Sequence, residues 1–310
     1  MKRIALVKDK NIFWTVYKKI IESFGFSCDL IDIWQENEAD KLFSNKYDGL
    51  IWRAKHTPKI RDLARKIINI FENELNIPCW PDWNSFSHYD DKVMQYYILK
   101  AKNIATPKTS VFYNKNMALE YLESCKYPFF YKSSTGAGAS NVGLIKSKGQ
   151  GKRYIAKVFG KGLKTYFEAD VQKDYVYFQE FLSNNKGDYK ILCFGDQIQG
   201  FFRANRPNSI YASGSNNIIL DKLPEKLLNF VESIHEKLSY DIMSYDIMSD
   251  FEENYVVTEF GAIWGDLKNK VYDEIGIYRK KDNIWIYDQA PDDRHFFQLK
   301  YLFQKWGFVD

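Results

Sequence analysis

The sequence predicts a small amino-terminal parallel α/β domain followed by a longer α+β region that is mostly antiparallel sheet. Up to residue 81, short apolar strands alternate with amphipathic helices, which is the pattern of a small parallel sheet with helices packed on it. From residue 176 onward, apolar and aromatic runs are joined by hairpin turns such as Gly195-Asp196. A hydrophobic content of 45% and an aromatic content of 17% over 310 residues indicate packed cores.

The charge and the cysteines exclude several classes of protein. The net charge of +4, from 44 basic and 40 acidic residues, is too small and too dispersed for a nucleic-acid-binding surface. The four cysteines are far apart and lack metal-ligand spacing, so we expect buried thiols in a reducing compartment. No apolar run approaches the roughly 20 residues of a membrane span, and the one at the amino terminus is too short for a signal peptide. We therefore expect a cytoplasmic protein.

The first domain is expected to contain three buried strands and an edge segment. The strands cover 3–7, 28–33 and 47–52, helices begin near Phe13 and cover 39–43 and 59–75, and residues 77–81 return to the sheet edge. Arg53 follows the third strand directly, where open parallel sheets present residues to ligands. It is therefore a candidate for binding a substrate carboxylate, with a solvated loop arginine as the alternative.

The central region contains a stretch suited to phosphate binding. After helices predicted over 87–99 and 117–124, an aromatic strand ends in Lys132 and is followed by small residues that include Gly136 and Gly138. Without bulky side chains, the amides of residues 134–140 can approach phosphate oxygens while Lys132 supplies a cation. The lysine precedes the glycines, so this is not a P-loop, and an ordinary hairpin turn is the alternative.

A basic stretch rich in glycine follows the predicted strand 142–145. It runs from Lys146 to Lys164. Such a stretch is usually a solvated face, but beside a phosphate loop it could also form a mobile lid over a nucleotide.

Two carboxylates on the last predicted hairpin form a candidate metal site. Strands are expected over 176–182, 189–194, 197–203, 215–220, 244–248 and 255–260, with helices over 223–238 and 296–305. A turn near residue 252 would place Asp246 across from Glu259. Facing carboxylates repel each other, and Mg²⁺ relieves this by binding carboxylate oxygens together with waters and substrate phosphates. The alternative is that one or both face solvent.

The order of these features resembles the ATP-grasp superfamily over almost the whole chain. The matching segments are Asp91-Lys92, the sequences at 104–109, 128–132 and 178–182, the glycine loop, Asp-Tyr-Lys-Ile-Leu-Cys-Phe-Gly-Asp at 188–196, Gly-Phe-Phe-Arg at 200–203, Tyr-Asp-Ile at 245–247 and Val-Thr-Glu-Phe at 257–260. The resemblance implies ATP bound between two α+β subdomains. We accordingly expect an amino-terminal domain of residues 1–86, a subdomain with the phosphate loop over 87–178 and a subdomain with the magnesium site over 179–310.

The resemblance also implies roles for individual residues. Lys92 and Lys132 would contact the nucleotide phosphates, Arg203 would stabilise an acyl phosphate, and Asp246 and Glu259 would bind Mg²⁺. Lys190 occupies a place where many relatives carry arginine, and it joins Arg203 and Lys132 as a catalytic candidate. The remaining nucleotide-binding candidates are the phosphate cover (Thr135, Gly136, Gly138, Ser140), the adenine hinge (Gln179, Glu180, Phe181, Leu182) and Asp188, which could reach the ribose.

One position departs from the pattern of the superfamily. Where many members have Glu-x-Asn, this chain has Glu259-Phe260-Gly261. A second magnesium ion would then be held by Glu259 and waters, be held by Asn217 from a neighbouring strand, or be absent.

The resemblance implies an ATP- and magnesium-dependent ligase. It would join a small-molecule carboxylate to an amine through an acyl phosphate, in the modification of surface polysaccharides or peptides. A homodimer is left open. Two alternatives remain: an ATP-dependent kinase that acts on an amide or amino acid, and a regulatory nucleotide-binding protein without turnover, which the missing asparagine motivates.

Overall fold

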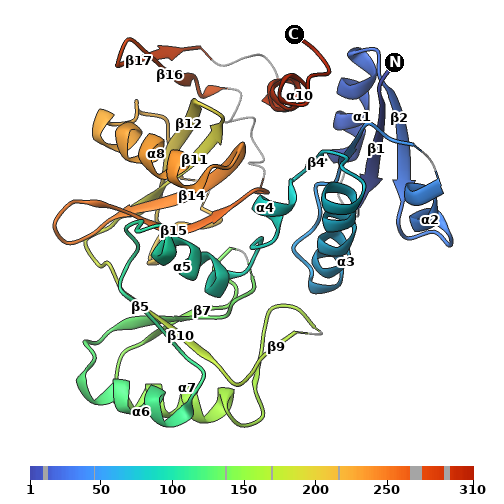
Figure 1. Ribbon diagram of the computed structural model, residues 1–310. Helices are drawn as coiled ribbons and strands as arrows, with labels where there is room; N and C mark the ends of the chain where they lie inside the picture. Colours follow the sequence, from blue (N-terminus) through green and yellow to red (C-terminus); the bar gives the residue numbers. More distant parts are fainter. Residues whose placement is uncertain are drawn as a thin grey trace.

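The computed structural model describes residues 1–9, 13–44, 46–136, 138–168, 170–215, 217–265, 274–289 and 294–310. Within these ranges, three large sheets with helices packed against them form the three lobes of the molecule (Figure 1). The first sheet is parallel and the other two are antiparallel, which confirms the predicted fold class. Among these residues, no helix has both the length and the apolar character that crossing a membrane requires.

The amino-terminal lobe is a four-stranded parallel sheet in the order β2-β1-β3-β4. Its elements are β1 (Arg3–Lys8), α1 (Phe13–Ser23), β2 (Ser27–Asp32), α2 (Glu38–Ser44), β3 (Gly49–Ile51), α3 (Pro58–Asn69), the π-helical turn η1 (Ile70–Glu74) and β4 (Cys79–Trp80). Since β1 and β3 are parallel neighbours, the residues after them meet at one edge. Asp9 Oδ2 accepts a hydrogen bond there from the Lys55 amide at 2.7 Å.

The central lobe carries an antiparallel sheet in the order β5-β10-β6-β7. Its elements are β5 (Thr109–Phe112), α6 (Lys115–Ser124), β6 (Phe129–Lys132), β7 (Val142–Ile145), α7 (Lys148–Val158), the hairpin β8 (Leu163–Lys164) and β9 (Val171–Gln172), and β10 (Val176–Glu180). Among the described residues, the hydrophobic cluster of this lobe draws on residues between 112 and 178. The expected subdomain boundary between residues 178 and 179 falls within β10.

The third lobe is built on a seven-stranded sheet that follows the path β15-β14-β11-β12-β16-β17, with β13 paired to β12. Its elements are β11 (Gly187–Phe194), β12 (Gln197–Ala204), β13 (Ile218–Ile219), α8 (Glu225–Leu238), β14 (Ile242–Ser249), β15 (Tyr255–Gly261), β16 (Ile277–Lys281), β17 (Ile284–Asp288) and α10 (Arg294–Lys305). Two helices, α4 (Trp83–Phe86) and α5 (Lys92–Ala101), connect the amino-terminal lobe to the rest of the chain (Figure 1).

The last helix, α10, returns to the amino-terminal lobe and lies beside α1 (Figure 1). One hydrophobic cluster combines Ile4 and Ile21 from that lobe with Phe194 and Phe201 from the large sheet and Leu299 from α10. The amino-terminal lobe and the large sheet therefore share apolar packing.

In the central region the structure decides between two interpretations and corrects one helix boundary. The basic stretch 146–164 is a solvated face and not a lid, because α7 buries Tyr154, Ile155 and Val158 in the core of the central lobe while its lysines are exposed. The polar helix predicted from residue 87 begins only at Lys92, since Asp91 Oδ1 accepts the Met94 amide at 3.0 Å and caps it.

The strands β5, β16 and β17 were not predicted.

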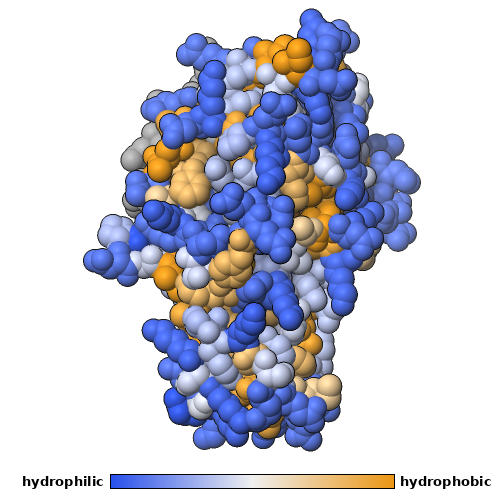
Figure 2. Space-filling model, turned by 90° about the vertical axis from the view of Figure 1, so that its left-hand side faces the viewer, coloured by the Kyte–Doolittle hydropathy of each residue, from blue (hydrophilic) through white to orange (hydrophobic). Residues whose placement is uncertain are grey.

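The face shown in Figure 2 is dominated by hydrophilic side chains, with apolar side chains gathered in separate groups.

Candidate functional site

The hairpin of β14 and β15 brings two carboxylates together. Asp246 pairs directly with Glu259, as the sequence pattern predicts. A β-bulge follows this pair, because Ile247 is opposite Val257 and leaves Thr258 as the extra residue. The Thr258 hydroxyl donates to the Asp246 carbonyl at 3.0 Å, which fixes the bulge. Both carboxylates line the same cleft.

Asp246 is held by two cations from neighbouring strands. Lys190 Nζ lies 2.9 Å from its Oδ1, and Arg203 Nη2 lies 2.9 Å from its Oδ2. Burial would raise the pKa of Asp246, but Arg203 and Lys190 hold it well below its usual range. Lys190 also donates to Ser244 Oγ at 3.1 Å, and that hydroxyl donates to the Gly261 carbonyl at 2.9 Å. The position of Lys190 is therefore fixed from both sides.

Asp188 completes this network through a bidentate pair with Arg203, with both nitrogen-oxygen distances at 2.8 Å. Burial raises the pKa of Asp188, and the adjacent guanidinium opposes this effect. The pair orients the planar guanidinium before any ligand binds. Asp188 lines the narrow cavity and both of its carboxylate oxygens face Arg203 of the next motif, so its contact with a ribose stays a prediction.

Lys92 lies buried at the start of α5, on the other side of the carboxylates. Its Nζ donates to the Gly136 carbonyl at 2.6 Å and lies 3.3 Å from Glu259 Oε1 and 3.7 Å from Asp90 Oδ1. Burial lowers the pKa of Lys92, but Glu259 and Asp90 outweigh this effect and raise it. Lys92 thus links the phosphate loop to the hairpin that carries the carboxylates.

Lys132, at the end of β6, is the second lysine of the cleft. Lys132 is partly buried, and desolvation lowers its pKa to about 8, although Glu259 acts in the opposite direction. Lys92 contributes to the lowering through like-charge repulsion. A bound polyanion would relieve that repulsion.

The phosphate loop is anchored through its backbone. Gly136 has a φ of +117°, and a Cβ there would lie 2.5 Å from Asn141 Nδ2, so the position requires glycine. Its amide donates to Asp90 Oδ1 at 2.8 Å, and the Ser134 amide donates to the Tyr175 hydroxyl at 2.8 Å. The expectation that the loop amides face phosphate therefore does not hold for these two groups, which are bonded within the protein.

Two cavities meet at the paired carboxylates. The narrow cavity, of about 290 Å³, is lined by apolar side chains, by Gly136 and Gly138, by the two lysines and by the whole predicted hinge, Gln179 to Leu182. The wide cavity, of about 600 Å³, includes Arg53, Lys190 and Arg203. Asp246 and Glu259 line both cavities.

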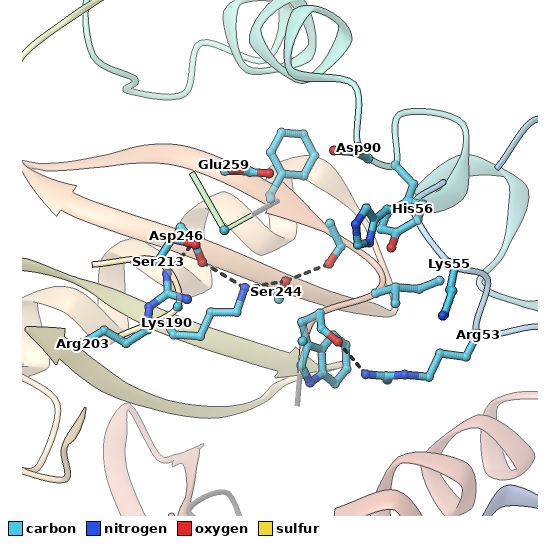
Figure 3. Close-up of a pocket in the computed structure, with 18 of the residues that line it drawn as sticks. Arg53, Lys55, His56, Asp90, Lys190, Arg203, Ser213, Ser244, Asp246 and Glu259 are labelled. Atoms are coloured by element: carbon cyan, nitrogen blue, oxygen red, sulfur yellow. Dashed lines mark hydrogen bonds and ion pairs between the residues drawn. The ribbon is translucent and has the colours of Figure 1, made fainter. Parts of the chain in front are cut away.

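Figure 3 shows the wide cavity from within. Lys190, Arg203 and Asp246 gather on one side of it, whereas Arg53 and Lys55 lie on the other. The walls come from all three lobes, since Arg53 follows β3, Gly138 belongs to the phosphate loop, and Lys190 and Arg203 lie on β11 and β12.

Three predicted site residues lie outside both cavities. The Thr135 hydroxyl donates to Asp170, Ser140 is exposed, and Asn217 is exposed with its carbonyl bonded to the Ala204 amide. A ligand role for Asn217 has no geometric support. Arg53 is buried, which excludes the solvated-loop alternative.

Solved structures that superpose on most of this chain include proteins named as ATP-grasp. D-cycloserine synthetase DcsG superposes with a TM-score of 0.64 at 12% identity, over 98% of this chain and 99% of DcsG. A RimK domain ATP-grasp protein from Sphaerobacter thermophilus superposes with a TM-score of 0.62 at 14% identity, over 87% of this chain and 94% of that chain.

The protein has the ATP-grasp fold. This confirms the resemblance stated from the sequence. The chain is also similar to the alpha-aminoadipate–LysW ligase LysX of Saccharolobus solfataricus, with 26% identity over 214 residues, which are 66% of this chain and 72% of that protein. LysX of Sulfurisphaera tokodaii is 26% identical over 219 residues, 67% of this chain and 71% of that protein. No protein-family model matches the chain.

The donor set of this ATP-grasp cleft fits a magnesium ion that binds together with phosphate. Among the described residues no group of three metal-ligating side chains occurs, so a cage made by protein alone is not present there. Asp246 and Glu259 lie at the junction of the cavities, and Mg²⁺ typically takes one or two carboxylates plus phosphates and waters, so the ion would share the oxygens of Asp246 with Lys190 and Arg203. Gly261, in place of the asparagine of many relatives, offers no side-chain ligand.

Several residues of the ATP-grasp cleft were not predicted. Asp90 binds Arg61 Nη1 at 2.9 Å and the Gly136 amide, and burial raises its pKa to about 6 against the opposing effect of Lys92. Its only sequence signal is that it precedes Asp91-Lys92. Lys55, His56 and Ser244 carry no motif, so only the fold brings them to the cleft.

Proposed function

We propose that this protein is an ATP- and magnesium-dependent ligase that joins a carboxylate to an amine through an acyl phosphate. The observation that carries the proposal is that Asp246 and Glu259 line both cavities. ATP in the narrow cavity would present its γ-phosphate at this junction, and an acid in the wide cavity would approach it from the other side.

The narrow cavity suits a nucleotide. The hinge from Gln179 to Leu182 and the apolar walls, which include Phe130 and Met248, can accept an adenine ring, while Lys92 and Lys132 lie near the carboxylate end. The Gln179 amide side chain is already bonded to Thr109 and Tyr177. It therefore shapes the pocket, and the adenine edge would be bound by the backbone that follows it.

The reaction needs no covalent nucleophile from the protein. A carboxylate oxygen of the substrate attacks the γ-phosphorus, the bond from that phosphorus to the β,γ-bridging oxygen breaks, and ADP leaves. The amine then attacks the acyl carbon, the carbon-oxygen bond to phosphate breaks, and the nitrogen loses a proton. The products are an amide, ADP and phosphate.

The residues of the cleft act by position and charge. Lys132 would stay with the transferred phosphoryl group, while Arg203 and Lys190 would face the carboxylate that becomes the acyl phosphate. Arg203 is already fixed by Asp188, so little reorganisation is needed when charge develops. Magnesium held by Asp246 and Glu259 would neutralise the phosphate oxygens.

The relatives support ligation and leave the acceptor class open. The curated relatives are named as ligases of alpha-aminoadipate and LysW, and one structural neighbour, PsnB, is an ATP-grasp ligase in complex with a precursor peptide. These names favour an amino acid or peptide as a substrate. None supports the expected role in polysaccharide modification, and we do not propose it.

The test is whether acids stimulate ADP release and whether hydroxylamine traps the acyl phosphate. We expect ATP, Mg²⁺, an amino-acid or peptide acid and hydroxylamine to give ADP and a hydroxamate. ADP with a stable phosphorylated product and no hydroxamate would indicate the kinase. ATP binding without ADP under every mixture would indicate the regulatory protein, and the absence of ATP binding would refute the nucleotide site.

A further inference from the structure

The far side of the wide cavity carries cationic groups that the proposed phosphoryl transfer does not use. Arg53 and Lys55 come from the loop after β3 and lie across the cavity from Lys190, Arg203 and Asp246 (Figure 3). The amino-terminal lobe thus contributes positive charge to a pocket whose reacting end lies in another lobe.

Arg53 is held rigidly in this wall. It is buried, it donates to the Trp264 carbonyl, and its guanidinium carbon lies 4.2 Å from the centre of the Phe13 ring. A guanidinium in this setting is a planar fork of donors that matches a carboxylate, and stacking keeps it oriented. Burial and the charge of Arg53 lower the pKa of Arg294 to about 10.

Lys55 is positioned by the neighbouring strand. Asp9, which follows β1, accepts its backbone amide at 2.7 Å, so the loop is fixed while the side chain reaches the cavity (Figure 3). The cavity is also lined by Tyr89, Phe201 and Trp264. The pocket therefore combines cationic groups on two sides with apolar side chains in its lining.

We propose that the wide cavity binds a substrate carboxylate at Arg53 and Lys55, in addition to the carboxylate that reacts at Lys190 and Arg203. The inference rests on the proposed ligase function and specifies its substrate class, an acid with anionic groups at both ends and an aliphatic middle. The same chemistry has a second source, because the amine substrate can carry the distal carboxylate when it is an amino acid.

The test uses calorimetric binding of simple acids to the full chain with AMP-PNP and Mg²⁺. The probes are glutarate, adipate, pimelate and suberate, each compared with the monocarboxylate of equal chain length. We expect at least one dicarboxylate to bind about tenfold more tightly than its monocarboxylate, because a second charged hydrogen-bonded contact is formed. Equal binding within every pair, together with no preference for amino acids in the amine comparison below, would overturn the proposal.

Two variants assign the site. Lys55→Gln and Arg53→Gln should each weaken dicarboxylate binding about tenfold and leave monocarboxylate and AMP-PNP binding unchanged. Lys157→Gln, on the exposed face of α7, is the matched control and should bind like the unaltered protein. Lys55→Gln keeps the test valid if Arg53→Gln fails to fold. Wild-type dicarboxylate affinity in Lys55→Gln and in folded Arg53→Gln would refute the assignment.

A second arm separates the two sources of the carboxylate. With a monocarboxylate present, the binding of glycine and of glutamate is compared with the binding of methylamine. If the protein prefers the amino acids and Arg53→Gln abolishes this preference, the distal carboxylate belongs to the amine. If AMP-PNP binds and no dicarboxylate or amino acid does, this inference fails while the ligase proposal stands. If AMP-PNP itself does not bind, the ligase proposal fails and this inference with it.

Discussion

The narrow and wide cavities share one pair of carboxylates, but they are built in different ways. The narrow cavity is lined mainly by short runs of consecutive residues, such as Gln179 to Leu182 and the phosphate loop. The wide cavity is also lined by short runs, such as Arg53 to His56, but its lining comes from all three lobes, from Phe13 to Gly265. Among the described lining residues, those of the amino-terminal lobe belong to the wide cavity, so this cavity depends on how that lobe packs against the other two.

The difference extends to the charges. Near the narrow cavity, Lys132 has a depressed pKa and would gain from a bound polyanion. On the large sheet, Lys190, Arg203, Asp188 and Asp246 already balance one another through short contacts. We infer that a bound nucleotide phosphate would favour the charged form of Lys132, and that the network on the large sheet is organised beforehand.

The largest effect is expected where the two cavities join. Asp246→Asn removes the charge that Lys190 and Arg203 share and one of the two candidate magnesium ligands, so ligase turnover should fall by a factor on the order of 10³. ADP release measures this, and Asp221→Asn at an exposed position is the control. Turnover within a few-fold of wild type would show that the junction is not the reacting centre.

A change in the narrow cavity alone should separate the two functions. Lys132→Met should weaken AMP-PNP binding about 100-fold through the loss of a charged contact, while dicarboxylate binding in the wide cavity stays unchanged. Calorimetry with each ligand provides the measurement, and Lys157→Met is the control. Normal AMP-PNP affinity in Lys132→Met would contradict the nucleotide site.

A change confined to the wide cavity should be milder. Ser244→Ala removes the hydroxyl that Lys190 contacts at 3.1 Å but leaves its ion pair with Asp246. We expect kcat to fall about fivefold, the value of one hydrogen bond, without a change in KM for ATP. A rise in KM for ATP with constant kcat would mean that Ser244 serves the nucleotide instead.

The smallest effect is a pH dependence confined to the narrow cavity. The pKa of Lys132 is about 8, below its ordinary value of 10.5, so the amine loses its charge as the pH rises through that region. Phosphate prefers the charged form, and AMP-PNP affinity should therefore fall several-fold between about pH 7 and about pH 9. In Lys132→Arg the charge persists, so the fall should be much smaller, and equal slopes would exclude Lys132 as the titrating group.

The sequence predicts much of the fold and the narrow cavity because their signals are local. The alternation of strands and helices, the Asp246–Glu259 pairing and the hinge follow from periodicity and motif order. Local sequence patterns cannot show which hydrogen-bond partner a backbone amide finds once the chain is folded. The Gly136 and Ser134 amides, expected to face phosphate, are bonded to Asp90 and Tyr175 instead.

The wide cavity illustrates the same limit. Arg53 could be proposed from its place after β3. Its burial, however, depends on Phe13, which lies well before it in the sequence, and on Trp264, which lies 211 residues after it. Lys55, His56 and Ser244 have no sequence signal at all. The basic stretch that contains α7 shows the opposite case, because its charge pattern correctly predicts an exposed face. The same pattern gives no information on whether the segment moves.

The self-contained core of the central lobe determines which part of the molecule can pivot. Among the described residues, its apolar cluster draws on residues between 112 and 178, so tilting this lobe outward leaves that cluster intact. Displacing the amino-terminal lobe would instead expose the apolar cluster that joins Ile4, Phe201 and Leu299 to water. The contacts that must loosen include the bonds of Lys92 and Asp90 to Gly136 and the ring contact of Phe130 with Tyr211. We therefore expect ATP to enter as the central lobe hinges away, a motion that spin labels on α7 and α8 would report as a distance that shortens when AMP-PNP is added.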